Sequence, residues 1–343
     1  MLIISEQDII NTYNARQQEQ CRLYYEYKKI KQENTDFGYK RIAKLLGHSY
    51  GKTRWWHAKK HLPIPIQTAE WLKSKNLIPL YLDNEKLPLI AKILGATFGD
   101  GGIDKNLNMI FLSSSEMKAL EDFKLDLINL FGKEIETNFD IRIGGINKTS
   151  HCIRNTNRNI IRFFKALNAP IGNKTKQEIF IPKWIELDSK TEDQFYFSFF
   201  GSEVGIPRCR GGQSNSFDIA ICGSPEFHTN RLLFMEKIKV YISTKGINSG
   251  KISINTSKSG FSQNTYLYRL LISTNVENML TFLYNLPLNY CYYKTDKLKN
   301  TIDDLLRVKR ERFVELKGMY RQNDEKILRK LNIKGKEIPF RAV

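Results

Sequence analysis

Cysteine is scarce in this chain of 343 residues and follows no disulfide or metal-binding pattern. The five cysteines, Cys21, Cys152, Cys209, Cys222 and Cys291, are odd in number, and none of them forms a Cys-x-x-Cys pair. Disulfide frameworks usually contain an even number of cysteines, and zinc ribbons are built from such pairs. The sequence therefore predicts neither a disulfide-stabilised fold nor a structural zinc site.

Long apolar runs are missing as well. No stretch reaches the ~20 apolar residues that a helix needs to cross a bilayer. The N-terminus, MLIISEQDIINTYN, also lacks the basic segment and the following apolar stretch of a secretory signal. We therefore expect no membrane partner, and we expect the protein to remain in the reducing cytoplasm of a prokaryote-like cell.

Acidic residues are outnumbered. The 36 Asp and Glu residues stand against 54 Lys and Arg residues, which leaves a formal charge of +18. A basic surface binds nucleic acid because neutralised phosphates release their condensed counterions. Charge alone does not separate DNA from RNA or from anionic lipid, and a lysine-rich surface can also be merely solvated. The charge balance predicts a polyanionic partner without identifying it.

The remaining composition is that of a folded globular protein. Hydrophobic residues make up 41% and charged residues 26% of the chain, a balance that supports a packed core and excludes general disorder. At about 100 to 200 residues for each domain, the length allows two or three units.

The first 80 residues are predicted to be helical and basic, and part of this region is typical of a helix-turn-helix. In GYKRIAKLLGHSYGKTRWWHAKKHLPIP, Ala43 is the small residue of the first helix, Gly47 forms the turn, and residues 49–59 form the recognition helix. Thr53 stands where such motifs usually place an aliphatic residue. A plain helical cap without DNA contacts is therefore the alternative.

From about residue 87 onward, apolar helices alternate with short strands, and this pattern occurs twice. Thr-Asn pairs precede the final helix of each copy at Thr156 and Thr274, 118 positions apart (274 − 156). Pro170 and Pro287 close the same helices, 117 positions apart (287 − 170). We expect each copy to be an αββαββα unit of about a hundred residues, and the two copies to form a pseudo-twofold pair.

This organisation predicts four regions. They are a helical, helix-turn-helix-like DNA-binding extension at 1–80, a first repeat at 81–185, a second repeat at 186–310, and a basic C-terminal helix or tail at 311–343.

The opening helices of the two copies place an acid in the same position. ILGATFGDG aligns with YFSFFGSEV at an offset of 103 (203 − 100), which pairs Asp100 with Glu203. At the same offset Gly95 matches Ser198, and Gly99 matches Ser202. Residues four apart share one helix face, so each helix carries a small-x-x-x-small edge that permits close helix packing.

Packing along these edges predicts that Asp100 and Glu203 emerge side by side. Two adjacent carboxylates repel each other unless a cation lies between them. Oxygen ligands of this kind select Mg²⁺ or a similar hard ion, which supports phosphodiester hydrolysis. A single Gly-Asp-Gly could equally be a helix end with a solvent-facing acid, but the pair at a domain-sized spacing favours a shared site.

The two segments resemble the motifs of the LAGLIDADG homing endonucleases, the first in the form G-x-x-x-G-D-G and the second as S-x-x-x-S-E-V. The resemblance covers residues 87 to about 310. The second motif departs from the pattern, because Val204 replaces the closing glycine and Gly201 stands where an acid is frequent. The resemblance implies an α+β fold of two pseudo-twofold αββαββα repeats with saddle-shaped antiparallel sheets, preceded by the small helical domain.

The resemblance also implies a set of site residues. Asp100 and Glu203 are the catalytic and metal-binding acids, and the backbone carbonyls of Gly99 and Ser202 complete the protein's ligands for Mg²⁺, with Mn²⁺ or Ca²⁺ able to occupy the same site. No small-molecule cofactor is expected.

A lysine follows the last helix of each repeat in this family. The matching residues are Lys174 and Lys294, with Lys176 and Lys297 as alternates if the register slips by a few positions. These lysines are expected to polarise water or the scissile phosphate. A role as phosphate clamps only is the alternative.

DNA reading is expected to fall to the hairpins of each repeat, because a β-ribbon fits the major groove and alternate side chains then face the bases. The turns at 211–212 and 258–260 are the candidate hairpin tips. The candidate contacts share a basic or amide side chain, and they are Arg142, Lys148, Arg154, Arg208, Arg210, Gln213, Asn215, Lys251, Lys258 and Arg269, with Lys52 and Arg54 on the helix-turn-helix.

The resulting hypothesis is a monomeric, metal-dependent endonuclease that cuts both strands of a long, asymmetric double-stranded DNA site. The chain begins with Met1 and ends in PFRAV, without the splicing residues of an intein, so we expect a freestanding or intron-encoded homing enzyme. The alternatives are an RNA maturase, a DNA-binding regulator that does not cleave, and a nucleic-acid-binding structural protein with no fixed site. An acid kept at both motif positions favours cleavage, because a pure binder gains nothing from carboxylates against phosphate.

Overall fold

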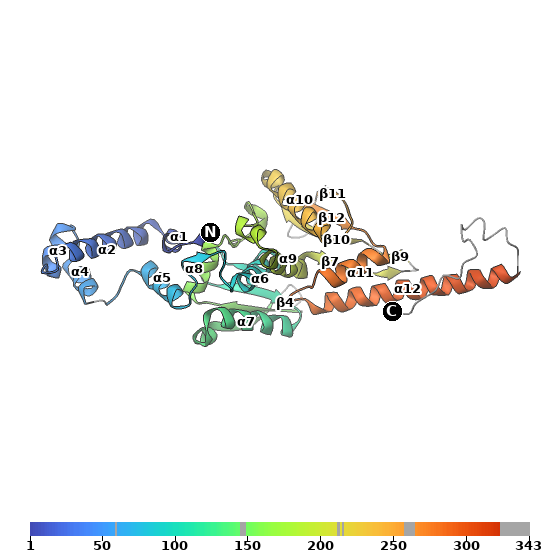
Figure 1. The fold of residues 1–343 in the computed structure, drawn as a ribbon, viewed down its shortest axis with the longest axis horizontal. Helices are drawn as coiled ribbons and strands as arrows, with labels where there is room; N and C mark the ends of the chain where they lie inside the picture. The colour runs from blue at the N-terminus through green and yellow to red at the C-terminus, as the bar shows by residue number, and fades with distance from the viewer. Residues whose placement is uncertain (59, 145–148, 211–212, 215, 257–264, 323–343) are drawn as a thin grey trace.

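The computed structural model describes the chain except for residues 59, 145–148, 211–212, 215, 257–264 and 323–343. The molecule is elongated (Figure 1), with a small helical unit at one end, a body that contains two four-stranded sheets, and a long C-terminal helix at the other end. In the described part of the chain, no helix combines the length and apolarity needed to span a membrane.

The N-terminal unit has a small core of its own. Its elements are β1 (Leu2–Ile4), α1 (Glu6–Asn11), α2 (Ala15–Glu33), α3 (Tyr39–Leu45), α4 (Tyr50–His57), α5 (Ile64–Ser74) and β2 (Leu80–Tyr81). Tyr24, Tyr27, Ile42 and Trp56 belong to a buried cluster that is separate from the main core. This cluster holds α3 and α4 against α2. Ile9 of α1, Ala69 of α5 and Leu80 of β2 instead belong to the main core, so that part of the unit packs against the body.

The chain between α3 and α4 turns at Gly47. Gly47 adopts φ +58°, a conformation that glycine takes at little cost. Thr53, which departs from the usual aliphatic pattern, is fully buried, and its hydroxyl donates to the carbonyl of Ser49 at 3.0 Å. A buried threonine is therefore accommodated because a backbone oxygen of its own helix accepts its hydrogen bond.

The first half of the body contains one antiparallel sheet. Its strands follow the order β3-β4-β6-β5. The elements of this half are α6 (Leu87–Phe98), β3 (Gly101–Ile103), β4 (Ile110–Ser114), α7 (Met117–Phe131), a 3-10 helix (Lys133–Asn138), β5 (Phe139–Gly144), β6 (Ser150–Asn155) and α8 (Arg158–Ala166).

The second half contains another antiparallel sheet, in the order β11-β12-β10-β7, and a separate two-stranded ribbon, β8-β9. Two 3-10 helices, Lys174–Lys176 and Lys183–Leu187, connect the halves. The elements are α9 (Ser189–Glu203), β7 (Val204–Gly205), β8 (Cys209–Arg210), β9 (Gln213–Ser214), β10 (Phe217–Gly223), a 3-10 turn (Pro225–Phe227), α10 (His228–Thr244), β11 (Ser249–Thr256), β12 (Tyr266–Ile272), α11 (Val276–Asn285) and α12 (Tyr292–Gln322). The predicted combination of helices with antiparallel sheets is confirmed.

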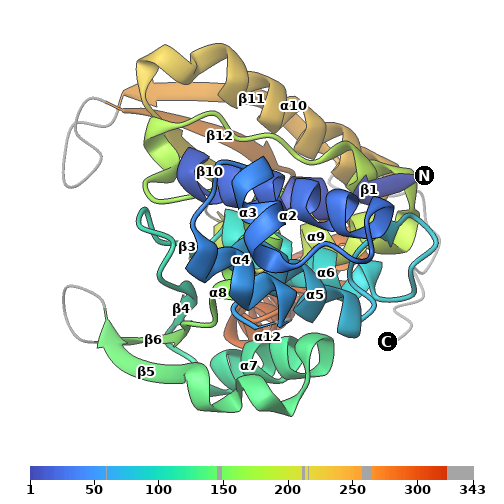
Figure 2. The same cartoon turned by 90° about the vertical axis from the view of Figure 1, so that its left-hand side faces the viewer.

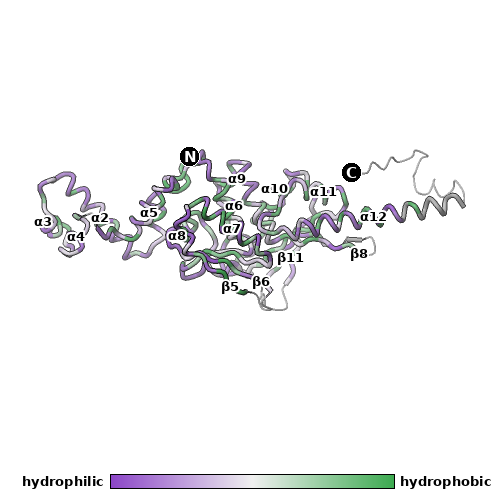
Figure 3. Tube along the Cα trace, turned by 90° about the horizontal axis from the view of Figure 1, so that it is seen from below, coloured by the Kyte–Doolittle hydropathy of each residue, from purple (hydrophilic) through white to green (hydrophobic). Residues whose placement is uncertain are grey.

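Each sheet buries one face. In β10, Phe217 and Ile219 are fully buried in the main core, whereas Ala220 and Cys222 point to the opposite, less buried face. Figure 3 shows β5, β6, β8 and β11 along one side of the molecule, with α6, α7 and α10 on the other side. The sheets therefore present a surface that the helices do not cover.

Helices α6 and α9 form the centre of the body (Figures 1 and 2), where they pack against each other. Nine of the 12 residues of α6 are buried, which explains why its sequence is apolar on nearly every side. The Phe98 ring lies between Phe195 and Phe234, with centroid distances of 5.2 Å and 6.2 Å. Aromatic packing of this kind fixes the two helices relative to each other.

The C-terminal helix extends across the boundary expected at residue 310. α12 runs without interruption from Tyr292 to Gln322, so position 310, the expected end of the second repeat, lies inside one continuous helix. Its first turns pack in the body, where Leu298 and Ile302 are buried. The part of α12 that packs in the body and the part that extends beyond it therefore form one continuous helix.

Gly95→Ala tests the close approach of α6 and α9. A Cβ at this position would overlap the backbone carbonyl of Phe195, which cannot move away as a side chain can. We expect a loss of about 2 kcal/mol or more in the free energy of unfolding, measured by denaturant titration. The matched control is Gly51→Ala in α4, where no atom lies within 4 Å of the new Cβ. Equal stability of the two variants would show that the helices do not approach closely at Gly95.

Candidate active site

Asp100 and Glu203 lie at adjacent ends of the two packed helices. Asp100 follows Gly99, the residue at which α6 ends, and Glu203 is the last residue of α9. A Cβ on Gly99 would overlap the side chain of Ser202, so the two residues that precede the acids are in direct contact across the helix pair. The small residues therefore bring the two acidic positions together.

The second motif is folded despite its departures from the pattern. Val204 is buried and begins β7, where it pairs with Ile219 of β10. Gly201 lies against the backbone of Asn289, whose carbonyl oxygen a Cβ would overlap. An acid at position 201 would therefore be excluded by the chain that leads into α12.

The pKa of Glu203 is shifted by burial and by the charged groups around it. Burial is the main cause that raises the pKa of Glu203 to about 7, and the negative charge of Asp100 adds to this effect. The ammonium groups of Lys174 and Lys294 act in the opposite direction. Glu203 as a whole residue is intermediate in exposure.

The two predicted lysines lie at the carbonyl ends of these helices. The Nζ atom of Lys174 donates to the carbonyls of Gly99 and of Gly101, the latter at 2.8 Å. The Nζ atom of Lys294 donates to the carbonyls of Gly201 at 2.8 Å and Ser202 at 2.5 Å. Each lysine thus binds the end of its own half's central helix, where the helix dipole favours a cation.

The surroundings of Lys174 are those of a buried amine. Burial lowers its pKa, against the opposing influence of Glu203 and Asp100. The alternates differ in position, because Lys176 is exposed and Lys297 lies one helical turn beyond Lys294 in α12. The structure thus brings Lys174 and Lys294, in preference to the alternates, to the two acids.

The donor set fits a hard divalent cation. Two carboxylates and the carbonyls of Gly99 and Ser202 are all oxygen donors, the type that Mg²⁺ and Ca²⁺ prefer. Both carbonyls accept hydrogen bonds from lysine in this structure. The described residues contain no group of three or more His, Cys, Asp or Glu side chains that could hold a metal. A cation at this site would therefore rely on water or phosphate oxygens for its remaining ligands.

The predicted DNA contacts of the first sheet are paired with an acid. Asp140 accepts from Arg142 at 2.9 Å and also forms an ion pair with Arg154, which lies opposite it in the ladder between β5 and β6. Sequence reasoning missed Asp140. Its spacing of two residues from Arg142 in a strand, which places both on one face, was the available signal.

The second sheet has a similar pair. Arg269 of β12 lies 2.7 Å from the carboxylate of Asp218 of β10, an acid that the sequence did not single out. Burial raises the pKa of Asp218, and Arg269 opposes this effect. Lys251 of β11 is exposed along the same sheet.

The other predicted contacts are spread over the molecule. Arg208, Lys52 and Arg54 are exposed, the last two on α4. The backbones of Arg210 and Gln213 lie in the ribbon β8-β9. Lys148, Asn215, Lys258 and both expected hairpin tips lie outside the described residues.

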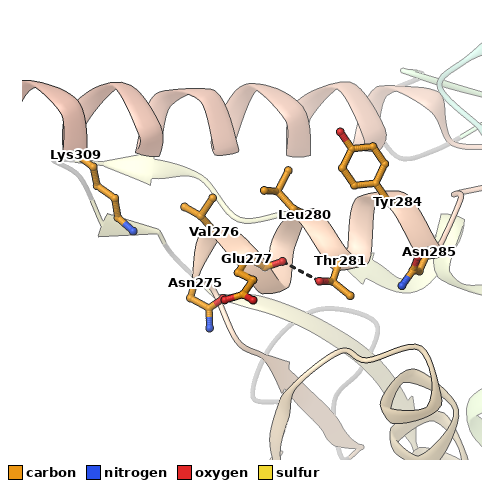
Figure 4. A pocket seen from close by; sticks show the side chains of 8 residues that line it. All are labelled: Asn275, Val276, Glu277, Leu280, Thr281, Tyr284, Asn285 and Lys309. Carbon is orange, nitrogen blue, oxygen red and sulfur yellow. Dashed lines mark hydrogen bonds between the residues drawn. The ribbon is translucent and has the colours of Figure 1, made fainter. Parts of the chain in front are cut away.

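An open groove of about 820 Å³ lies far from the acids, between α11 and α12 (Figure 4). Its lining combines Glu277, exposed Tyr284 and Lys309 with apolar side chains, and Thr281 donates to the carbonyl of Glu277 at 2.9 Å. None of the predicted catalytic residues lines it.

Sequence comparison finds relatives with different names. No protein-family model matches the chain. The tRNA-splicing ligase RtcB of Pyrococcus abyssi is 28% identical over 260 residues, which are 73% of this chain and 27% of that protein. The replication factor C small subunit of Methanocaldococcus jannaschii is 29% identical over 239 residues, 66% of this chain and 12% of that protein. The archaeal Lon protease of Pyrococcus abyssi is 35% identical over 118 residues, 34% of this chain and 11% of that protein. The chain spans roughly a quarter or less of the length of these relatives.

Among solved structures, mesophilic variants of the homing endonuclease I-DmoI give a TM-score of 0.36 at 13% identity, with 59% of this chain and 91% of that chain covered. I-DmoI in complex with DNA and Mn gives the same TM-score of 0.36 at 13% identity, with 58% and 96% covered.

The raised pKa of Glu203 makes the stability of the metal-free protein depend on pH. Between about pH 4.5 and pH 7 the folded state binds the proton that the unfolded state has lost, so stability falls as pH rises through this window. Glutamine does not ionise, so Glu203→Gln removes this fall in stability. We expect the variant to be more stable than the native chain by about 2 to 3 kcal/mol at pH 8, and nearly equal to it at pH 4.

The measurement is denaturant unfolding in the presence of a chelator at both pH values. Glu85→Gln, at an exposed position before α6, measures the effect of removing a surface carboxylate. A Glu203→Gln variant that gains no stability between pH 4 and pH 8 would show that this carboxylate is not buried beside Asp100.

Proposed function

We propose that this protein is a metal-dependent endonuclease of the LAGLIDADG homing type, which hydrolyses both strands of a long double-stranded DNA site. One observation carries the proposal. The small-residue contact between α6 and α9 joins the positions that directly precede Asp100 and Glu203, and a lysine lies at the end of each helix. Paired acids with paired lysines are suited to cutting two phosphodiester bonds, one on each strand.

The relatives support a separable nucleic-acid module. A tRNA-splicing ligase, a replication factor subunit and a protease share no single activity, yet this chain matches a minor part of each. The shared segment is therefore better explained as a unit that is independent of those activities. Two of the three names refer to nucleic-acid processes, which agrees with the charge of +18.

The proposed division of labour follows from the chemistry of the site. Asp100 and Glu203, with the carbonyls of Gly99 and Ser202, would hold Mg²⁺ or Mn²⁺. A divalent ion in such a site supplies Lewis-acid stabilisation and a more acidic bound water. Lys174 and Lys294 hold positive charge beside the acids, where it stabilises the charge that develops on a phosphate.

DNA recognition is assigned to the uncovered faces of the two sheets. We infer that residues 81–185 and 186–310 act as pseudo-twofold repeats of αββαββα type, and that the chain works as a monomer on an asymmetric site. The N-terminal unit, 1–80, would extend the contact through α4, where Lys52 and Arg54 are exposed. Residues 311–322 continue α12. The whole segment 311–343 adds basic charge.

A second function, binding without cleavage, is favoured by one observation. The carbonyls of Gly99 and Ser202 already accept hydrogen bonds from Lys174 and Lys294. If these bonds persist on DNA, the site would hold a cation poorly. The protein would then act as an RNA maturase or as a regulator, with affinity but no nuclease activity.

Cleavage of a target plasmid in Mg²⁺ tests the two functions against each other. We expect the native chain to cut, because the two acids are brought together at the helix ends. Asp100→Asn and Glu203→Gln should each reduce cutting by about 10²-fold or more while DNA binding is retained. Glu203→Gln should accumulate nicked plasmid, because the second motif departs more from the pattern.

Asp83→Asn, at an exposed position outside the site, is the matched control and should cut normally. Binding by a native chain that never cuts would establish the second function. Full activity in both acid variants would remove Asp100 and Glu203 from the site.

Asp140→Asn tests the assignment of the first sheet to DNA. The change removes an acid from the uncovered face and releases Arg142 and Arg154 from their ion pairs. We expect DNA to bind several-fold tighter at low salt, and the slope of log K against log salt to steepen by about 1 for each arginine that then contacts phosphate.

The comparison is with Glu136→Gln, an exposed acid paired with Lys124 of α7 at 3.1 Å. Equal salt slopes for the native chain and both variants would place the β5-β6 face away from the DNA.

A further inference from the structure

The segment that carries Lys174 is held by the second half of the molecule. Arg231 of α10 donates through Nη2 to the carbonyls of Lys174 at 2.5 Å and Gln177 at 2.7 Å. The backbone N–H of Ser224 donates to the carbonyl of Thr175 at 2.8 Å. The residues just after the lysine are therefore fixed by α10 and by the turn that precedes it.

Asn230 secures the end of the same segment. Its side chain accepts from the backbone N–H of Ile179 and donates to the carbonyl of Ile179, both at 3.0 Å. Such a two-way bond satisfies both backbone groups of one residue, as a neighbouring strand would. The segment 174–179 thus binds α10 at its beginning, middle and end.

Arg231 is fully buried, and the hydrogen bonds that it donates go to oxygen atoms of neutral groups. Besides the two carbonyls above, it donates to the carbonyl of Cys222 at 3.3 Å and to the side-chain oxygen of Asn230 at 2.7 Å. Gly223 leaves room for it, since a Cβ there would lie 2.7 Å from the arginine side chain. Burying a guanidinium is costly unless several acceptors surround it. Two of the acceptors that offset this cost are carbonyls of the lysine segment, so the same hydrogen bonds fix the backbone of that segment.

The segment that carries Lys294 lies in the second half and is held by the first half. The hydroxyl of Tyr290 donates to Asp126 at 2.5 Å, and the hydroxyl of Tyr292 donates to Asp122. The backbone N–H of Tyr293 donates to the carboxylate of Glu116 at 3.0 Å. Asp122 and Asp126 belong to α7, and Glu116 is its N-cap. The first half therefore fixes the residues just before Lys294.

We propose that α7 and α10 are crossed braces, each of which positions the lysine of the other half. Arg231 and Asn230 position Lys174, while Asp122 and Asp126 position Lys294 through the two tyrosines. These are positioning residues, because they contact the lysine segments and not the acids. This inference rests on the proposed function for the role of the lysines, but the braces themselves can be measured without cleavage.

The alternative is that these bonds merely join the two halves. Joining would lower stability and DNA affinity when lost, but would act independently of either lysine. Positioning acts through the lysine, so its loss has no further effect once the lysine is removed.

A double-mutant cycle with Arg231→Met and Lys174→Met separates the two explanations. Single-turnover cleavage should slow by about 10-fold or more in Arg231→Met, with unchanged DNA affinity, and Arg231→Lys should recover part of the rate. In the Lys174→Met background, Arg231→Met should slow cleavage less than about 2-fold. The matched control is Lys237→Met. Lys237 lies on the same helix as Arg231, and its replacement removes only a surface ion pair with Glu186, so this variant should cut normally. If Arg231→Met slowed cleavage as much in the Lys174→Met background as in the native chain, the proposal would be overturned.

The brace from α7 to the Lys294 segment provides a second double-mutant cycle. If Arg231→Met does not fold, this second cycle alone tests the proposal. Tyr292→Phe removes only the hydroxyl that donates to Asp122, and exposed Tyr284→Phe is its control. Tyr292→Phe should slow cleavage several-fold in the native background and have little effect together with Lys294→Met. Additive effects of Tyr292→Phe and Lys294→Met would count against crossed positioning.

Amide hydrogen exchange reads the first brace without DNA or metal. Asn230→Ala should speed exchange in residues 174–179 by about 10-fold or more and leave α6 and α9 unchanged. A native chain that does not cut would refute the proposed function, while local exchange of this kind would still establish the brace. Unchanged exchange at 174–179 in Asn230→Ala would refute the brace, even in an active nuclease.

Discussion

The close approach of α6 and α9 is the constraint on which the rest of this structure depends. At Gly95 the backbone of one helix meets the backbone of the other, and at Gly99 it meets the side chain of Ser202. Any side chain at Gly95 or Gly99 would change the separation of the two helices. Because each helix continues directly into a strand of its own sheet, β3 or β7, the same contact sets the position of the two sheets relative to each other. It also brings the charge of Asp100 to bear on Glu203, where it adds to burial in raising the pKa of that carboxyl group.

The parts that could be predicted from the sequence are those whose signal is local or repeated. Helical periodicity and the repeated motif predicted α6, α9 and the acidic positions at their ends, and the resemblance to the LAGLIDADG family implied Lys174 and Lys294 as residues of the same site. The ion pairs of Asp140 and Asp218 with arginines were missed, because a pairing across strands depends on register, which a single sequence does not contain. Arg231 was missed for a similar reason. Nothing near it in the chain indicates that its acceptors are carbonyls more than 50 residues away.

Charge is distributed less simply than a total of +18 suggests. On the uncovered faces of the sheets, acids accompany Arg142, Arg154 and Arg269, which holds these side chains in defined directions. An arginine held by a partner loses less conformational freedom when it meets a base edge, but it must also leave or share that partner. For the proposed DNA partner, such faces would favour selective contacts over general attraction to phosphate. General attraction would instead come from exposed residues for which the described part of the chain shows no ion pair, such as Lys251.

The crossed contacts of α7 and α10 have a consequence for how such a molecule can change. A protein built from two similar halves invites exchange of one half for a foreign one, in evolution or in the laboratory, as a way to combine half-sites. Here an exchanged half would bring a middle helix that lacks the partners of the remaining lysine segment. One segment needs a guanidinium and an amide from its neighbour, and the other needs carboxylates that face two tyrosines. Each half contains a four-stranded sheet covered by helices, but under the proposed bracing the halves are not interchangeable. Successful hybrids would have to carry these helices across with the segments that they hold.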